Sequence, residues 1–181
     1  MKLAKIRLLH TKKMKNENEN GYKLEIYVEK LYYDLGKLNV KRNVQYNIKK
    51  IFSKELIKKI QVDVQFFDLK GTNIVECKYL SSGAVNDDDV NKLRKNTEYL
   101  GNDNGILVTN KDFSENAVRL AGKYEIKLIS GNELRKMDYD RSLFSYIQGK
   151  FGKRADLEKQ LKGISLSKYS NEPVIKTKYV I

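Results

Sequence analysis

Cysteine and histidine are almost absent from this sequence, with one of each in 181 residues. The single cysteine, Cys77, cannot form an internal disulfide, which fits a protein of the reducing cytoplasm. A structural zinc site needs about four cysteine or histidine ligands, so none can be built here. The same scarcity argues against histidine-metal nucleases and cysteine–histidine proteases. His10 lies in a polar segment, where we expect it at the surface.

Long apolar runs are also missing. No stretch is long and apolar enough to span a bilayer. Residues 1–9 are basic and apolar, but neither a signal-peptide core nor a small-residue cleavage site follows them. We therefore expect a cytoplasmic protein with no membrane partner. The sequence shows no internal repeat, and its length suits one domain with an appendage.

Positive charge, in contrast, is abundant. Lysine and arginine number 36 against 23 aspartate and glutamate residues, giving a net charge of +13. A domain this basic usually meets a polyanion, which predicts nucleic acid as a partner. The alternative is a lysine-rich surface that only keeps the protein in solution. Catalysis, if present, must come from carboxylates and lysines, and this favours a hard, oxygen-binding cation such as magnesium.

The stretch from residue 60 to residue 80 organises the rest of the chain. Two runs rich in β-branched and apolar residues flank a short segment that contains Gly71, and this pattern predicts a β-hairpin. Asp63 lies on the first strand, and Glu76 and Lys78 lie on the second. Buried charges of this kind must be paired or must bind a metal. A metal site and a cross-strand ion pair are therefore the two readings.

Strand alternation decides part of the geometry of this hairpin. Glu76 and Lys78 point to one face, and Cys77 between them points to the other. Asp63 joins the first two only if the turn sets an odd register, which the sequence leaves open. Tyr79, Gln45 and Gln65 are candidates for neighbours of this site, with no role assigned to them.

The N-terminal third contains a helix and a basic region. We expect residues 1–20 to form a basic, mobile segment and residues 21–36 to form a helix that ends at Gly36. Glu25 on this helix is either a solvated carboxylate or a group aimed at the site. Residues 38–46 read as a strand, and residues 47–59 as a hairpin tip in preference to a short helix. Candidate contacts to a nucleic-acid backbone are Lys41, Arg42, Lys49, Lys50, Lys58 and Lys59, with a charge-blunted edge strand as the alternative.

The remainder alternates helices and strands. Asp87, Asp88 and Asp89 are assigned to the cap and first turn of a helix, because adjacent helix positions do not converge on one ion. A buried parallel strand at 105–109, a helix from Ser114, a strand at 125–129 and a helix from residue 130 follow. This order predicts an α/β fold with a mixed central β-sheet flanked by helices.

Residues 138–181 differ in character from this core, which we place at residues 21–137. Short helices are expected near 143–147 and 155–161, and an edge or exchanged strand at 173–181. Covering the core, forming a dimer contact and touching DNA are all open roles for this extension.

Asp63 followed by Glu76-Cys77-Lys78 resembles the core motif of the PD-(D/E)XK nucleases. The segments 21–25, 105–110, 113–117 and 128–134 also resemble the Mrr-type restriction endonuclease branch, over roughly residues 21–137. Two departures stand out. Residues 60–62 lack the glycine and proline with which the family usually approaches the aspartate. Glu76 stands where many Mrr-type domains carry glutamine.

The resemblance implies a restriction-endonuclease-like core and a metal-dependent DNA endonuclease that acts as a homodimer. Asp63 and Glu76 would hold Mg²⁺, or Mn²⁺, with the Cys77 backbone carbonyl as a further ligand and Glu25 as an outer or second-metal ligand. Lys78 would hold or deprotonate the attacking water and stabilise charge on the phosphate. A Holliday-junction resolvase and an inactive DNA-binding protein on the same fold are the alternatives; an RNA-directed nuclease ranks lower.

Overall fold

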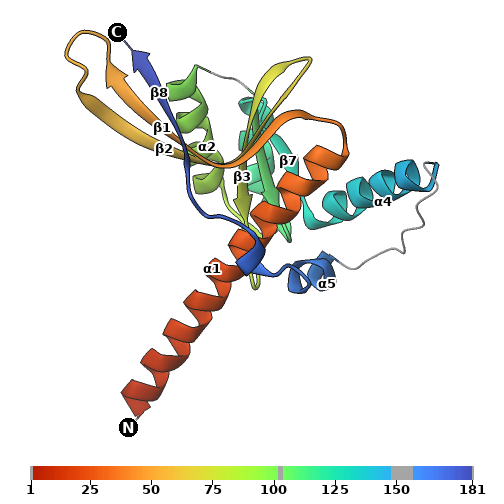
Figure 1. Ribbon diagram of the computed structural model, residues 1–181. Helices are drawn as coiled ribbons and strands as arrows, with labels where there is room; N and C mark the ends of the chain where they lie inside the picture. Colours follow the sequence, from red (N-terminus) through yellow and green to blue (C-terminus); the bar gives the residue numbers. More distant parts are fainter. Residues whose placement is uncertain (1, 102–103, 148–156, 181) are drawn as a thin grey trace.

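A mixed six-stranded sheet forms the centre of the molecule (Figure 1). The computed structural model describes residues 2–101, 104–147 and 157–180, with side chains for 17–101, 104–140 and 157–180. The strand order is β7-β5-β3-β2-β1-β8, in which β1, β2 and β3 are antiparallel and the β3–β5, β5–β7 and β1–β8 pairs are parallel. The strands are β1 (Leu38–Lys50), β2 (Leu56–Asp68), β3 (Gly71–Lys78), β5 (Gly105–Thr109), β7 (Lys127–Ile129) and β8 (Val174–Val180).

Helices cover both faces of this sheet, as the sequence predicts. Helices α1 (Lys2–Asp34), α4 (Gly131–Ile147) and α5 (Leu157–Lys162) lie on one face. Helices α2 (Asp87–Leu100) and α3 (Glu115–Lys123) lie on the other. Two short strands, β4 (Ala84–Val85) and β6 (Asp112–Phe113), pair beside the main sheet, and a 3₁₀ turn spans Leu166–Lys168. None of the described helices is long and apolar enough to cross a membrane.

Both predicted hairpins are present. Strands β1 and β2 continue to the Lys49↔Leu56 pair, so residues 47–59 form a hairpin and not a helix. Strands β2 and β3 meet through the Asp68↔Gly71 pair, where Gly71 has a φ of +104° that favours glycine. The buried strand β5 and the capped helices α2 and α3 also match the prediction.

Two helix predictions were too short. Helix α1 begins at Lys2, so residues 2–20 are helical, and the helix passes through the expected boundary at residue 20 without a break. This segment contains neither glycine nor proline and is rich in good helix formers. Likewise, the helices expected from residue 130 and at 143–147 are one helix, α4, because no breaker separates them.

The C-terminal extension covers the core. Leu157 and Leu161 of α5 are buried in the same apolar cluster as Leu24 and Leu31 of α1. Strand β8 then pairs with β1, so residues 174–180 form an edge strand as predicted. Residues 155–156 of the second predicted helix lie outside the described residues; α5 begins at Leu157.

Candidate active site

The central sheet forks where the motif residues lie. The β2–β3 ladder ends at the Val64↔Val75 pair. Beyond that pair β2 continues along β1, whereas β3 continues along β5 through Glu76↔Leu107. One further step of the same register sets Asp63 opposite Glu76. The first residue beyond the last β2–β3 pair is therefore a carboxylate on each strand, Asp63 on β2 and Glu76 on β3.

Asp63 spans this fork. Its Oδ2 accepts a hydrogen bond of 2.8 Å from the backbone N–H of Cys77. Cys77 lies between Glu76 and Lys78 in the sequence, so this hydrogen bond places the Asp63 carboxylate beside these two residues of β3. The question of register that the sequence leaves open is thus resolved in favour of the grouping.

Glu76 and Lys78 face helix α2, whereas Cys77 packs against the apolar cluster on the α1 side. Glu76 is only 6% exposed. Its Oε1 lies 3.2 Å from Lys78 Nζ and 2.7 Å from Lys92 Nζ. Lys78 Nζ also lies 3.1 Å from Asp89 Oδ1. A chain of alternating charges therefore connects strand β3 to helix α2.

Sequence reasoning missed the contribution of α2. Asp87, Asp88 and Asp89 form the first turn of this helix, as predicted, whereas the N-cap is Asn86 and not an aspartate. Asp89 also pairs with Lys78. Lys92 follows Asp89 by one helical turn. Both residues flank the buried stripe of Val90 and Leu93. That i, i+3 spacing beside an apolar stripe is the one sequence signal that could have identified them.

Glu25 approaches the site from α1. Burial, and then the nearby Asp63 carboxylate, raises the pKa of Glu25 to about 8, with Glu76 and Glu29 adding to the shift. Burial and the Glu76 carboxylate raise the pKa of Asp63 to about 7, against the hydrogen bond from Cys77. Each of these carboxylates thus disfavours the ionised form of its neighbours, as expected for acidic groups gathered in one place.

The pKa of Lys78 is also raised, but for a lysine this favours the charged form. Burial lowers its pKa, but the Glu76 and Asp89 carboxylates outweigh burial, so the pKa of Lys78 is raised. The Lys78 side chain is therefore an ammonium ion at neutral pH.

The donor set of this site suits a hard cation. Glu25, Asp63 and Glu76 offer carboxylate oxygens, and the Cys77 carbonyl is available in the same segment. As placed, however, no three acidic, cysteine or histidine side chains of the described part of the chain converge on one ion position. Lys78 and Lys92 neutralise Glu76 instead. An ion bound here would have to displace these ammonium groups from Glu76.

The other predicted neighbours lie outside the charge cluster. Gln65 accepts hydrogen bonds from Tyr46 Oη (2.5 Å) and Lys176 Nζ (3.0 Å). Gln45 donates to Asn47. Tyr79 packs beside the apolar cluster of the α1 face. None of these contacts involves Asp63, Glu76 or Lys78.

The predicted basic residues divide into two groups. Arg42 has a side chain only 7% exposed; it pairs with Glu29 at 3.1 Å and donates to the Ser170 carbonyl. It therefore joins α1, β1 and the C-terminal segment. The remaining residues lie along the β1–β2 hairpin: Lys41, Lys49, Lys50, Lys58 and Lys59.

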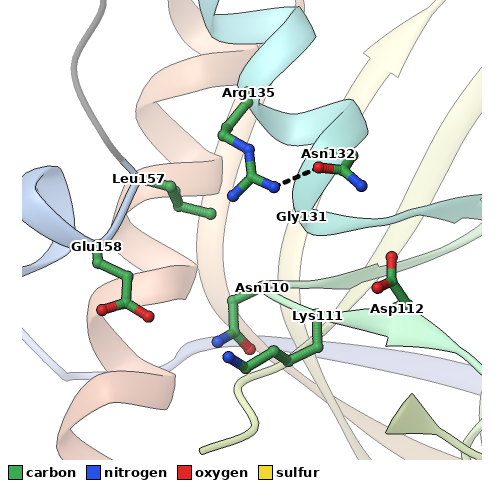
Figure 2. Close-up of a pocket in the computed structure, with 8 residues that line it drawn as sticks. All are labelled: Asn110, Lys111, Asp112, Gly131, Asn132, Arg135, Leu157 and Glu158. Atoms are coloured by element: carbon green, nitrogen blue, oxygen red, sulfur yellow. Dashed lines mark hydrogen bonds between the residues drawn. The ribbon is translucent and has the colours of Figure 1, made fainter. Parts of the chain in front are cut away.

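A small pocket of about 160 Å³ lies beyond the carboxyl end of β5 (Figure 2). Asn110 forms one wall and ties the pocket to the segment after Lys78, since it exchanges two hydrogen bonds with the Leu80 backbone. Arg135 of α4 points into the pocket and donates to Asn132. Leu157 and Glu158 of α5 close the other side, so the C-terminal extension shapes a hollow beyond the carboxyl end of β5.

Known proteins resemble this chain in both sequence and fold. A family model described as restriction endonuclease, the Mrr catalytic domain, matches residues 17–137. No curated protein matches the chain at a significant level. The crystal structure of a protein of unknown function, AF1548, is similar over 81% of this chain and 91% of that one, with 18% identity and a TM-score of 0.55.

Two further structures are similar to this chain over part of their own length. They are protein VC1899 from Vibrio cholerae (21% identity, TM-score 0.48) and Can2 from Sulfobacillus thermosulfidooxidans in complex with cyclic tetra-adenylate (15% identity, TM-score 0.49). This chain covers 33% and 34% of their lengths, and 72% and 68% of its own. The family match covers α1 from residue 17 onward, the strands of the sheet other than β8, and the motif residues, and the chain therefore belongs to the restriction endonuclease family of Mrr-type catalytic domains.

Proposed function

We propose that this protein is a divalent-metal-dependent endonuclease that hydrolyses phosphodiester bonds in DNA, in an Mrr-like restriction or mobile-element role. Its family membership indicates a nuclease domain that acts on DNA. The observation that carries the proposal is the 2.8 Å hydrogen bond from the Cys77 N–H to Asp63, because it brings the Asp63 carboxylate to Glu76 and Lys78 at the fork of the sheet.

The carboxylates are the metal-binding part of the proposed site. Asp63 and Glu76 would hold Mg²⁺ or Mn²⁺ together with the Cys77 carbonyl, and Glu25 would be an outer or second-metal ligand. The ion would polarise the phosphoryl oxygens and supply hydroxide near neutral pH. The raised pKa values of Glu25 and Asp63 fit this assignment, because a cation favours the ionised form that their crowding disfavours.

Lys78 is the residue that would stabilise negative charge in the proposed site. Glu76 and Asp89 keep its ammonium group protonated at neutral pH, so in this charge state it cannot remove a proton from water. We assign it to stabilising the charge that builds on the phosphate and to orienting the attacking water. Asp89 would act as a positioning residue through Lys78.

The test is a cleavage assay with plasmid, linear duplex, single-stranded DNA and a four-way junction, each with and without Mg²⁺. We expect metal-dependent nicking or cutting that is lost in Asp63→Ala and Lys78→Ala, while DNA binding persists. Cleavage that persists in a clean Asp63→Ala preparation would refute the site. Cutting confined to the junction would instead indicate a resolvase, and binding without any cleavage an inactive relative.

Two further expectations belong to this proposal. One such site normally cuts one strand, so cutting both strands of a duplex calls for two copies, and we propose a homodimer. A DNA substrate and a single unpaired cysteine are consistent with a cytoplasmic protein. Light scattering on the purified protein, with and without DNA, measures the oligomeric state directly.

A further inference from the structure

We propose that residues 47–59, here called the hairpin arm, enter a groove of duplex DNA and place Phe52 against the bases. The arm is the distal half of the β1–β2 hairpin, and it projects from the body of the molecule at the upper left of Figure 1. The inference rests on the proposed function for the identity of the polymer. It adds a contact surface remote from the active site, with a defined distance from it.

Charge selects the partner of the arm. The arm carries five lysines and one glutamate, and that glutamate, Glu55, already pairs with Lys50 at 3.1 Å. Ile48 is fully buried on the α2 side, so its neighbours on β1, Asn47 and Lys49, point to the other face. Lys59 lies directly opposite Asn47 on β2 and therefore also points away from α2. A second arm of the same charge would repel this one, whereas a polyanion neutralises it.

The tip of the arm is apolar and uncovered. Phe52 is 91% exposed, and Ile51, Leu56 and Ile57 around it are between 44% and 46% exposed. The turn is built firmly, with Lys54 N–H donating to Lys50 O and Ile51 N–H donating to Val180 O. DNA-bending proteins insert apolar side chains such as phenylalanine, leucine and isoleucine between base steps. The tip of the arm offers side chains of these types, with lysines on both sides of them in the sequence. A two-stranded ribbon is also narrow enough for the major groove.

The arm and the active site share strand β2, which fixes their separation. Leu56 and Asp63 are seven residues apart, a span of ~23 Å for extended chain. At ~3.4 Å per base pair, that distance corresponds to ~7 base pairs of duplex. Leu56 would therefore lie about seven base pairs to one side of the bond that is cut, and Phe52, in the turn beyond Leu56, would contact DNA further out.

The first experiment measures binding alone, so that it does not depend on cleavage. Fluorescence anisotropy with a labelled 30-base-pair duplex in EDTA compares Phe52→Ala with Leu69→Ala, which removes a fully exposed leucine from the opposite β2–β3 turn. We expect Phe52→Ala to weaken binding roughly tenfold, as loss of one base-stacking side chain does, and Leu69→Ala to leave it unchanged.

The second experiment measures how DNA binding depends on salt concentration. The triple variant Lys49→Gln/Lys54→Gln/Lys59→Gln should lower the slope of log K against log[salt] by about 2 to 3, since each phosphate contact contributes ~0.9. The matched control Lys127→Gln/Lys136→Gln/Lys159→Gln changes the net charge equally on exposed lysines elsewhere and should change the slope much less.

The outcomes separate this inference from the proposed function. Arm variants that bind DNA like their matched controls would overturn the inference even if the protein cleaves DNA. A Phe52→Ala variant that changes only the oligomeric state in light scattering would also overturn it, in favour of a second copy as the occupant. Weaker DNA binding by the arm variants than by their controls supports the inference that the arm contacts DNA, whether or not Lys78→Ala shows that the site is catalytic.

Discussion

Glu76 carries two ammonium neighbours, Lys78 and Lys92, and this fact makes a prediction about metal affinity. Both cations oppose an ion that would share the Glu76 carboxylate. Lys92→Ala should therefore bind Mn²⁺ roughly fivefold more tightly, the size expected when ~1 kcal/mol of charge repulsion is removed. Calorimetric titration measures this affinity. Lys95→Ala, an exposed position one turn further along α2, should match the wild-type protein, and equal affinities for all three would contradict the prediction.

Asp63 makes stability depend on pH. Its pKa is about 7 in the folded chain against an ordinary value of 3.8, so between these values the folded state binds more protons than the unfolded state. The free energy of unfolding must then fall as pH rises through this window. In EDTA, Asp63 should contribute a loss on the order of 2 kcal/mol between pH 5 and pH 8. Glu25, with a pKa of about 8, adds a loss of the same sign, so Asp63→Asn should lose clearly less than wild type but not nothing. Urea unfolding at the two pH values checks both.

The motif residues could be predicted from sequence, but their contacts could not. Spacing and alternation identify Asp63, Glu76 and Lys78, because strand periodicity is local. Whether Asp63 lies beside Glu76 depends on the pairing register of the two strands across the turn. A sequence of this pattern is compatible with two registers, which put Asp63 on opposite faces of the sheet. Asp89 and Lys92 reach the site only through the packing of α2 on the sheet. Their spacing beside the apolar stripe indicates which face of the helix packs, but not which residues of β3 that face meets.

At the scale of elements, the close approach of the start of α4 to the segment after β5 depends on one glycine. A Cβ at Gly131 would lie 2.3 Å from the backbone oxygen of Asn110, and backbone cannot move aside as a side chain can. Gly131→Ala should destabilise the fold by about 1–3 kcal/mol through overpacking. Gly122→Ala is the matched control, since nothing lies within 4 Å of that position in α3, and there alanine should stabilise by ~0.5–1 kcal/mol. Thermal unfolding should show shifts of opposite sign.

Helices and strands whose apolar residues and end signals are clear in the sequence were predicted well, and those without such signals were not. The strands β2, β3 and β5 and the helices α2 and α3 have apolar residues at regular spacing with glycine or a capping residue at their ends. The first half of α1 has apolar residues mainly at its start, at Leu3, Ile6, Leu8 and Leu9, and residues 10–20 are almost entirely polar. No apolar stripe therefore runs along this half to mark it as a helix, and residue propensity accounts for its helicity. Helix α4 was divided because its continuity between residues 134 and 143 has no strong periodic signal.

At the scale of the whole molecule, the extension beyond the family match is part of the fold. Leu157 and Leu161 are 2% and 3% exposed and pack against α1. Leu157→Ala and Leu161→Ala should each lower the free energy of unfolding by about 2–5 kcal/mol, as large-to-small core changes do. Lys159→Ala, exposed on the same helix, should change it by less than about 0.5 kcal/mol. Chemical denaturation measures all three, and values for the leucine variants as small as the lysine value would show α5 to be dispensable.

The exposed Phe52 at the hairpin tip has a practical consequence, because the sequence contains no tryptophan. Phe52→Trp would introduce the sole indole of the chain at the outermost point of the ribbon. Its emission would report one location only, free from background, and stopped-flow mixing could then time the arrival of a polymer at the tip separately from any chemistry at the fork.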